Sequence, residues 1–275
     1  MYQESFAGYF LQENPPEECL WQAQLPRRGW AWEFLRRSAA YQADYQESLA
    51  GGGSEAAKWG LLHFCDPALD ATIAPVLWRP EQSSEVLLLT ASREQTGWVR
   101  LDLNSLPRCA FRRFDARQRR HDVLIGDRGR FLQLAIFGDR DIGDASLLVS
   151  ALGEHTAITA RAIALRRLND VLCTGSMCAS LYPAENRARR LSKILIALDG
   201  SLSGLNQREI AKRMVGSDRV EREWNHPSEN LRDQVRRAVS CGQQLMTGGY
   251  RQFLRLTFGR RIAFEQGRRP VKQPA

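Results

Sequence analysis

The chain has 275 residues, of which 43% are hydrophobic and 25% are charged, which is typical of a globular protein with a sizeable core. Its formal net charge of +8 is unevenly distributed: residues 1–186 carry 20 Lys and Arg against 23 Asp and Glu, whereas residues 187–275 carry 19 against 8. The last third therefore holds the basic excess and is expected to bind a polyanion, with nucleic acid favoured over a membrane surface. A merely solvated basic surface is the alternative.

Neither a metal site, a cofactor nor a membrane span is expected. The cysteines form no CxxC pair, and Cys173 and Cys178 stand five residues apart with no nearby histidine, which disfavours zinc and fits free thiols in a reducing cytoplasm. The first ten residues lack the pattern of a signal peptide, and no apolar stretch of about 18 residues occurs, so a cytoplasmic location is expected. The six cysteines are Cys19, Cys65, Cys109, Cys173, Cys178 and Cys241.

The N-terminal part is expected to contain an amphipathic helix from Trp30 to about Gln46, followed by a flexible break over residues 51–54. This break is not a phosphate loop, because no Gly-Lys-Ser/Thr follows it. The aromatic side chains of the helix supply more apolar area than one helix needs. They are a candidate surface for self-assembly, or they pack onto the predicted sheet. These residues are Trp30, Trp32, Phe34, Tyr41 and Tyr45.

Short strands in an antiparallel meander are expected next, over residues 85–92, 98–103, 121–125 and 130–137. The last two flank a Gly-Asp-Arg-Gly segment, residues 126–129, whose composition is typical of a β-hairpin turn. From Asp144 onward the apolar period becomes helical, which predicts a short helix over residues 144–152 and a longer one over residues 158–172.

The last third is predicted to form amphipathic helices. The first, residues 184–198, has apolar side chains at i, i+3, i+4 and i+7 and is expected to stop at Asp199-Gly200. The second, residues 207–215, begins after Asn206, and Glu209 stands three residues later, as in a capping box.

A third helix is expected over residues 229–246, with Ser228 as its N-cap. The interval before it is far longer than the turn of a simple helix-turn-helix, so residues 217–224 are expected to form a short intervening helix. This segment, with Arg219 and Arg222, is the alternative recognition element.

Arginine is well suited to clamping phosphates and to bidentate contact with guanine, so the third helix could enter a major groove. Alternatively, its arginines pair with Glu229 or Asp233 on a solvated helix face. The candidate DNA-binding residues are Gln207, Arg208, Lys212, Ser228, Asn230, Arg232, Arg236, Arg237 and Arg251.

No catalytic set is expected. His63 and Cys65 place a base near a thiol, but nothing in the sequence orients the imidazole. Asp139, Asp141 and Asp144 resemble the start of a calcium loop, yet the twelfth position from Asp139 is Ser150 instead of a bidentate glutamate. The chain is therefore expected not to be an enzyme.

The order of the C-terminal motifs resembles the RovC DNA-binding domain family. These motifs are the helix ending at residues 197–200 (ALDG), then residues 208–211 (REIA), Trp224, residues 231–237 (LRDQVRR) and residues 248–251 (GGYR).

The upstream half resembles the transcriptional-regulator-like domain that often precedes that family, through Trp30, residues 32–37, Tyr41, Trp59-Gly60, Asp66-Pro67, Pro75 and residues 78–80. Together the resemblance covers most of residues 28–256. It implies a transcriptional activator of type VI secretion genes that assembles as a homo-oligomer, a hexamer by resemblance. Related domains regulate the transfer of conjugative elements.

The expected fold class is α+β: an N-terminal helix and an antiparallel meander, followed by an all-α, helix-turn-helix-like DNA-binding domain. The expected division is an assembly region over residues 1–143, a DNA-binding domain over residues 144–258 and a basic tail over residues 259–275. The favoured function is a cytoplasmic, homo-oligomeric regulator that binds double-stranded DNA, with RNA polymerase as a possible further partner. The alternative is a protein-binding anti-activator or a regulator of conjugative transfer.

Overall fold

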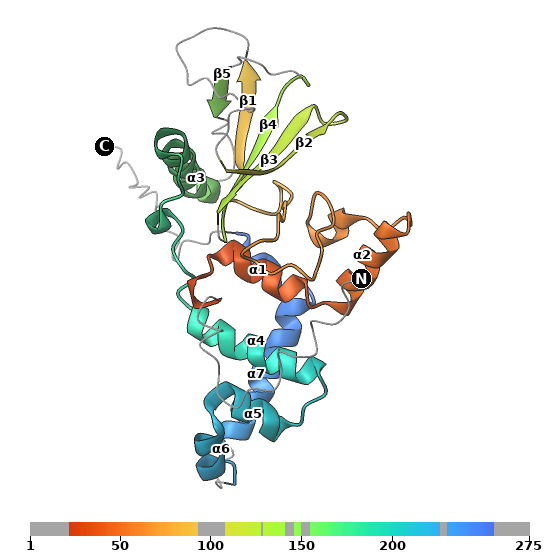
Figure 1. Ribbon diagram of the computed structural model, residues 1–275, viewed down its shortest axis with the longest axis vertical. Helices are drawn as coiled ribbons and strands as arrows, with labels where there is room; N and C mark the ends of the chain where they lie inside the picture. Colours follow the sequence, from red (N-terminus) through yellow and green to blue (C-terminus); the bar gives the residue numbers. More distant parts are fainter. Residues whose placement is uncertain are drawn as a thin grey trace, which may run out of the picture.

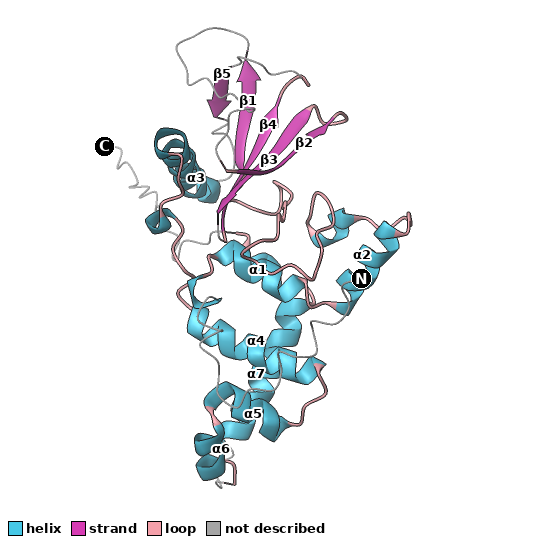
Figure 2. Cartoon of the chain, viewed as in Figure 1, coloured by secondary structure: helices cyan, strands magenta, loops and turns pink. Residues whose placement is uncertain are grey.

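The computed structural model describes residues 22–92, 108–127, 129–140, 146–149, 155–225 and 230–255. Figure 1 shows a β-sheet at one end of the molecule and the helices α5 and α6 at the opposite end, with α1, α4 and α7 between them. Helices and strands both contribute, as Figure 2 shows, so the expected α+β class is confirmed.

The N-terminal helical region consists of α1 (Arg27–Leu35) and α2 (Ala39–Leu49), flanked by the 3₁₀ turns η2 (Gln22–Gln24) and η3 (Ala56–Trp59). The single helix expected over residues 30–46 is therefore wrong. Ser38 has an extended backbone, and its hydroxyl accepts a hydrogen bond from the amide of Tyr41, so it caps a new helix. Serine at an N-cap satisfies one of the free amides that begin a helix.

The sheet has the strand order β2-β3-β4-β1-β5. The hairpin of β3 (Arg120–Asp127) and β4 (Arg130–Phe137) is confirmed, with Asp127 opposite Arg130. The strands β2 (Cys109–Asp115), β3 and β4 form an antiparallel meander, of which the sequence predicts β3 and β4 but not β2.

Two other expectations about the sheet are wrong. Strand β1 (Leu87–Ser92) pairs in parallel with β4, so the sheet is mixed. The short helix expected over residues 144–152 is replaced by β5 (Ser146–Val149), which pairs antiparallel with β1. A short apolar run fits a buried strand and a helix equally well by periodicity, and here pairing with β1 decides between them. The strand expected over residues 98–103 lies outside the described residues.

Helix α3 (His155–Thr174) confirms the helix expected over residues 158–172, and it packs beside the sheet in Figure 1. Its buried side chains Ala164, Leu168 and Val171 share a core with apolar residues of β1, β3 and β4. On the other face, Leu124 and Phe131 pack against Leu77. The central strands are thus covered on both sides.

The C-terminal part contains the turn η4 (Ala179–Leu181) and the helices α4 (Ala188–Leu202), α5 (Gln207–Val215), α6 (Ser217–Glu223) and α7 (Asn230–Met246), followed by η5 (Gly249–Phe253). The stop expected at Asp199-Gly200 is wrong, because α4 continues past it. A Cβ atom at Gly200 would lie 2.9 Å from Cγ1 of Ile210, so this glycine allows α5 to pack closely on α4.

The N-terminal aromatic residues belong to the core that the first and last parts of the chain share. The ring centroids of Trp30 and Phe34 lie 6.2 Å apart, and those of Phe34 and Phe253 lie 6.1 Å apart. The hydroxyl of Tyr250 donates to the carbonyl oxygen of Trp59 at 2.9 Å.

Four of the five aromatic side chains are buried within this core, which excludes them as an exposed assembly surface: Trp30, Trp32, Phe34 and Tyr41. That core contains residues of α4, α7 and η5 and none of the sheet strands, so the alternative packing onto the sheet is wrong as well. The division at residue 143 stays a prediction.

A buried ionic network also joins the N-terminal helical region to α4. The carboxylate of Glu33, in α1, accepts hydrogen bonds from the amide of Ala71 at 2.8 Å and from the guanidinium groups of Arg36 at 2.9 Å and Arg37 at 2.6 Å. Arg37 also forms a bidentate pair with Asp199 of α4. Burial by itself lowers the pKa of Arg37, but the carboxylates of Asp199 and Glu33 raise that pKa above its usual range.

Candidate nucleic-acid interface

The helices α4 to α7 form a closely packed scaffold. Ala211 of α5, Val220 of α6 and Val235 of α7 are all fully buried. A Cβ atom at Gly242 would lie 2.9 Å from the Cβ of Leu198 and 3.3 Å from the carbonyl oxygen of Ile194. The backbones of α7 and α4 therefore approach closely at this glycine, and side chains on the outer faces of the helices are held on a packed support.

Helix α5 begins with a complete capping box. The side chain of Asn206 accepts from the amide of Glu209 at 3.0 Å, and the carboxylate of Glu209 accepts from the amide of Asn206 at 2.9 Å, as the sequence predicts. Gln207, Arg208 and Lys212 are exposed on this helix, whereas its apolar side chains face the core.

Helix α6 follows α5 after a single residue, Gly216, whose φ of 89° lies in the region that favours glycine. This confirms the short intervening helix and accounts for the long interval before α7. Arg222 is exposed on α6. Arg219 donates through Nε to both carboxylate oxygens of Glu223, at 3.1 and 3.0 Å.

Helix α7 presents its arginines beside one carboxylate. Arg236 pairs with Asp233, and an Nη of Arg237 lies 3.9 Å from the same carboxylate. The guanidinium of Arg232 lies over the ring of Trp224, 5.5 Å from its centroid. The alternative that arginines of α7 pair with a carboxylate of the same helix is thus confirmed for Arg236 and Arg237. Ser228 and Glu229 lie outside the described residues.

These pairs do not sequester the arginines. The side chains of Arg236, Arg237 and Asp233 are 55%, 78% and 42% exposed. Exposed ion pairs contribute about 0–1 kcal/mol, so a stronger anion can displace Asp233 at small cost. Arg236 and Arg237 are therefore accessible to an external partner.

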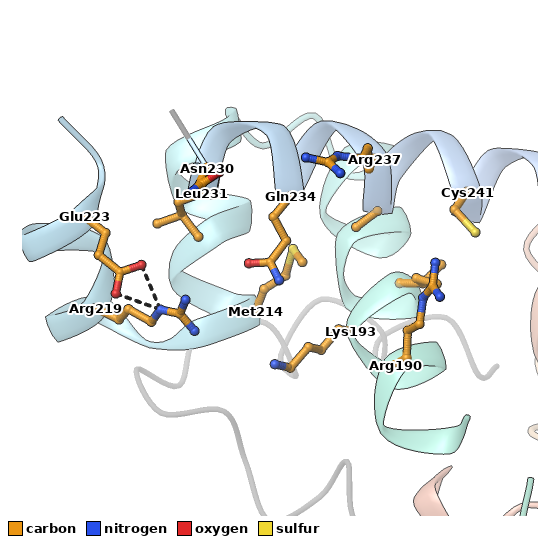
Figure 3. A pocket seen from close by; sticks show the side chains of 12 residues that line it. Arg190, Lys193, Met214, Arg219, Glu223, Asn230, Leu231, Gln234, Arg237 and Cys241 are labelled. Atoms are coloured by element: carbon orange, nitrogen blue, oxygen red, sulfur yellow. Dashed lines mark hydrogen bonds and ion pairs between the residues drawn. The ribbon is translucent and has the colours of Figure 1, made fainter. Parts of the chain in front are cut away.

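A groove of about 430 Å³ lies between α4, α6 and α7 (Figure 3). Its cationic lining residues are Arg190 and Lys193 from α4, Arg219 from α6 and Arg237 from α7. Glu223 is its acidic lining residue, and it is paired with Arg219. The apolar lining comes from Ile194, Met214, Leu231 and Ala238, and Asn230 and Gln234 add side-chain amides.

Arg251 lies away from this groove, in η5 beyond the C-terminal end of α7. It donates to the carbonyl oxygen of Lys58 at 2.8 Å, and its guanidinium lies 5.0 Å from the ring centroid of Tyr250. Helix α7 has 17 residues, and at about 1.5 Å per residue it separates Asn230 from Met246 by roughly 24 Å.

Two family models match the chain. Residues 151–255, from before α3 to η5, match the RovC DNA-binding domain, described as "T6SS, Transcription factor, DNA binding domain". Residues 22–63, which include α1 and α2, match the "Proteobacterial transcriptional regulator-like domain". The chain therefore carries a RovC-type DNA-binding domain, and its two matched domains indicate a transcriptional regulator. No curated protein matches it.

Both matched families are described as domains of transcriptional regulators, which indicates a non-enzymatic regulator, and the first description includes DNA binding. The basic module that the sequence singles out, residues 187–255, falls within the RovC DNA-binding domain. The family resemblance drawn from the motifs is thereby confirmed.

The structure adds groove residues that the candidate site set lacks. Asn230 and Arg237 of that set line the groove, whereas Gln207, Arg208, Lys212 and Arg236 are exposed on α5 and α7 outside its lining. Arg190 and Lys193 were missed, although their i, i+3 spacing places them on one side of α4. Helical spacing cannot show that this side faces α6 and α7.

The surroundings of His63 and Cys65 do not suit a catalytic pair. Burial raises the pKa of the Cys65 thiol to about 12, which leaves it protonated and unreactive at neutral pH. The His63 ring packs against Phe111, with centroids 4.7 Å apart, and its Nδ1 is buried without a hydrogen-bond partner.

Because the pKa of His63 is lowered, first by burial and then by Arg113, the folded protein is expected to lose stability in acid. The unfolded chain binds a proton below its ordinary pKa of about 6.5 and the folded chain resists it, so unfolding is favoured as pH falls through that range. The loss is at most about 1.4 kcal/mol per pH unit. Urea denaturation at pH 7.5 and 5.5 measures this loss, and His63→Phe should reduce the difference in unfolding free energy between the two pH values. A difference as large as that of the wild type would assign the acid sensitivity to other groups.

Within the described residues, no cluster of three His, Cys, Asp or Glu side chains could hold a metal ion, and no helix has the length and apolarity to cross a bilayer. Asp141 and Asp144 of the rejected calcium loop lie outside those residues. The cysteines that the structure describes are free thiols: Cys65, Cys109, Cys173, Cys178 and Cys241.

Proposed function

We propose that this regulator activates transcription by binding double-stranded promoter DNA through α5, α6 and the N-terminal half of α7. The observation that carries the proposal is the distribution of charge on this module. Its apolar faces are buried in the core, while cations on all three helices are exposed or paired only at the surface. A packed scaffold that presents such cations suits the phosphate backbone of nucleic acid.

Within this surface, the cationic and amide side chains of α5 would contact phosphates and set affinity: Gln207, Arg208 and Lys212. Asn230, Arg232 and Arg236 would supply base contacts, because Asn and Arg match adenine and guanine edges in the major groove. Arg237 would contact a phosphate. Ser228 stays a candidate N-cap contact. Arg251 would meet only DNA that extends along the whole of α7.

The family resemblance supports further parts of the proposal. The target would be genes of a type VI secretion system, and the protein would act in the cytoplasm as a homo-oligomer, with six subunits by resemblance. Several copies on repeated half-sites would raise the effective concentration of each DNA-binding module. An activator would also contact RNA polymerase.

Replacement of Arg236 and Arg237 by alanine is expected to lower promoter affinity about 10- to 100-fold, since one base contact and one phosphate contact are lost. Fluorescence anisotropy with a labelled promoter fragment, measured over a salt series, gives both the affinity and its salt dependence. Arg113→Ala with Arg117→Ala is the matched control. It removes the same charge from two exposed sites on β2 and the turn after it, at the opposite end of the molecule.

Unaltered affinity of the α7 variant would contradict its place in the interface. Binding that is insensitive to salt would instead favour the alternative of a protein-binding anti-activator. Counterion release by DNA predicts a log–log slope of about −0.9 for each phosphate contact.

A further inference from the structure

The groove between α4, α6 and α7 brings cations from three helices to one place. Figure 3 shows Lys193, Arg219 and Gln234 reaching from different helices toward the same space. Arg190 also lines this space, from the same helix as Lys193. Arg190 and Lys193 are exposed, and neither has an ion-pair partner among the residues that the structure describes. Two cations of α4 without an ion-pair partner in the described part of the chain therefore line the same groove as Arg219.

The groove has an apolar floor that the core holds in place. Ile194, Met214, Leu231 and Ala238 are buried members of the main core. Close packing of Gly242 against α4 fixes the spacing of α4 and α7. The groove is thus formed before any ligand arrives, with charge at its rim and apolar surface beneath.

This combination fits a sugar–phosphate unit, because cationic and amide donors bind phosphate oxygens and the apolar floor accepts the sugar. Building on the proposed function, we infer that Arg190 and Lys193 of α4, together with Arg219 of α6, contact the phosphate backbone of the bound DNA along this groove. Helix α4 is then one wall of the DNA interface, and its two cations position the duplex without reading its sequence.

The surroundings favour the backbone of a long nucleic acid over a free nucleotide. Further exposed cations lie outside the groove lining on α5, α6 and α7: Arg208, Lys212, Arg222 and Arg236. A single nucleotide within about 430 Å³ could not reach these residues, whereas a polymer that passes over the groove meets them.

The test compares Arg190→Ala with Lys193→Ala, made together, against Arg189→Ala. Arg189 is an exposed neighbour on α4 that does not line the groove. The double variant is expected to reduce the salt slope of DNA binding by about 1–2 units and to weaken binding to promoter and unrelated duplexes by the same factor. Arg189→Ala should keep the wild-type slope. The three substituted side chains are all exposed, so the variants are expected to fold, and circular dichroism melting checks this.

A second arm titrates the wild-type protein with adenosine monophosphate alone, where no binding is expected. Wild-type slope and affinity in the double variant would overturn the inference while leaving the proposed function intact. Nucleotide binding that the double variant abolishes, with DNA binding unchanged, would also overturn it and assign the groove to a small ligand. Wild-type protein that binds no duplex would defeat the proposed function itself, and this inference with it.

Discussion

Replacement of Glu33 by alanine is expected to lower the free energy of unfolding by about 3–5 kcal/mol, because removing one partner of a buried ion pair leaves the other uncompensated. Glu33 is fully buried and accepts hydrogen bonds from Ala71, Arg36 and Arg37. The variant would leave two largely buried guanidinium groups without this carboxylate, although Arg37 keeps Asp199.

Urea denaturation of the whole chain measures this loss, and Glu81→Ala is the control. Glu81 pairs with Arg79 at the surface, with a side chain that is 59% exposed, so its removal should cost no more than about 1 kcal/mol. Equal losses in the two variants would show that the Glu33 network contributes no more than a surface pair.

Replacement of Gly242 by alanine is expected to destabilise the protein, although helix propensity alone predicts a gain of about 1 kcal/mol in a helix interior. The added Cβ would lie 2.9 Å from the Cβ of Leu198. The backbone fixes the position of a Cβ atom, so this contact cannot be relieved by a change of rotamer. Overpacking of this kind costs about 1–3 kcal/mol, and valine should cost more than alanine because it adds two further methyl groups.

The matched control is Ser240→Ala with Ser240→Val, two residues earlier on the exposed face of α7. There the two substitutions should differ only by their small difference in helix propensity. Thermal melting of the four variants separates the effects. A Gly242→Ala variant as stable as the wild type would show that α4 and α7 can move apart at this point. In that case the groove would not be preformed.

Several features could be predicted from the sequence because their signals are local. The capping box of Asn206 and Glu209 lies within one helical turn, and the hairpin of β3 and β4 follows from two apolar runs with turn residues between them. The separation of basic from acidic charge needs no structure at all, and it places the candidate interface in the same region as the matched DNA-binding domain.

The features that the sequence could not supply depend on contacts between distant segments. The aromatic side chains of α1 were recognised as a surplus of apolar area, but only packing on Phe253 and its neighbours shows that the last helices cover them. In the same way, pairing with β1 makes a strand of residues that would also fit a helix.

The candidate interface also has one part that the sequence determines and another that only the tertiary structure decides. Charge and helical periodicity determined that the cations of α4 to α7 lie off the apolar faces, because side chains three or four residues apart share one side of a helix. Only tertiary structure decided that Arg190 and Lys193 line one groove together with Arg219. That arrangement depends on how the α4 and α7 backbones meet at Gly242, and one helix does not determine the orientation of another.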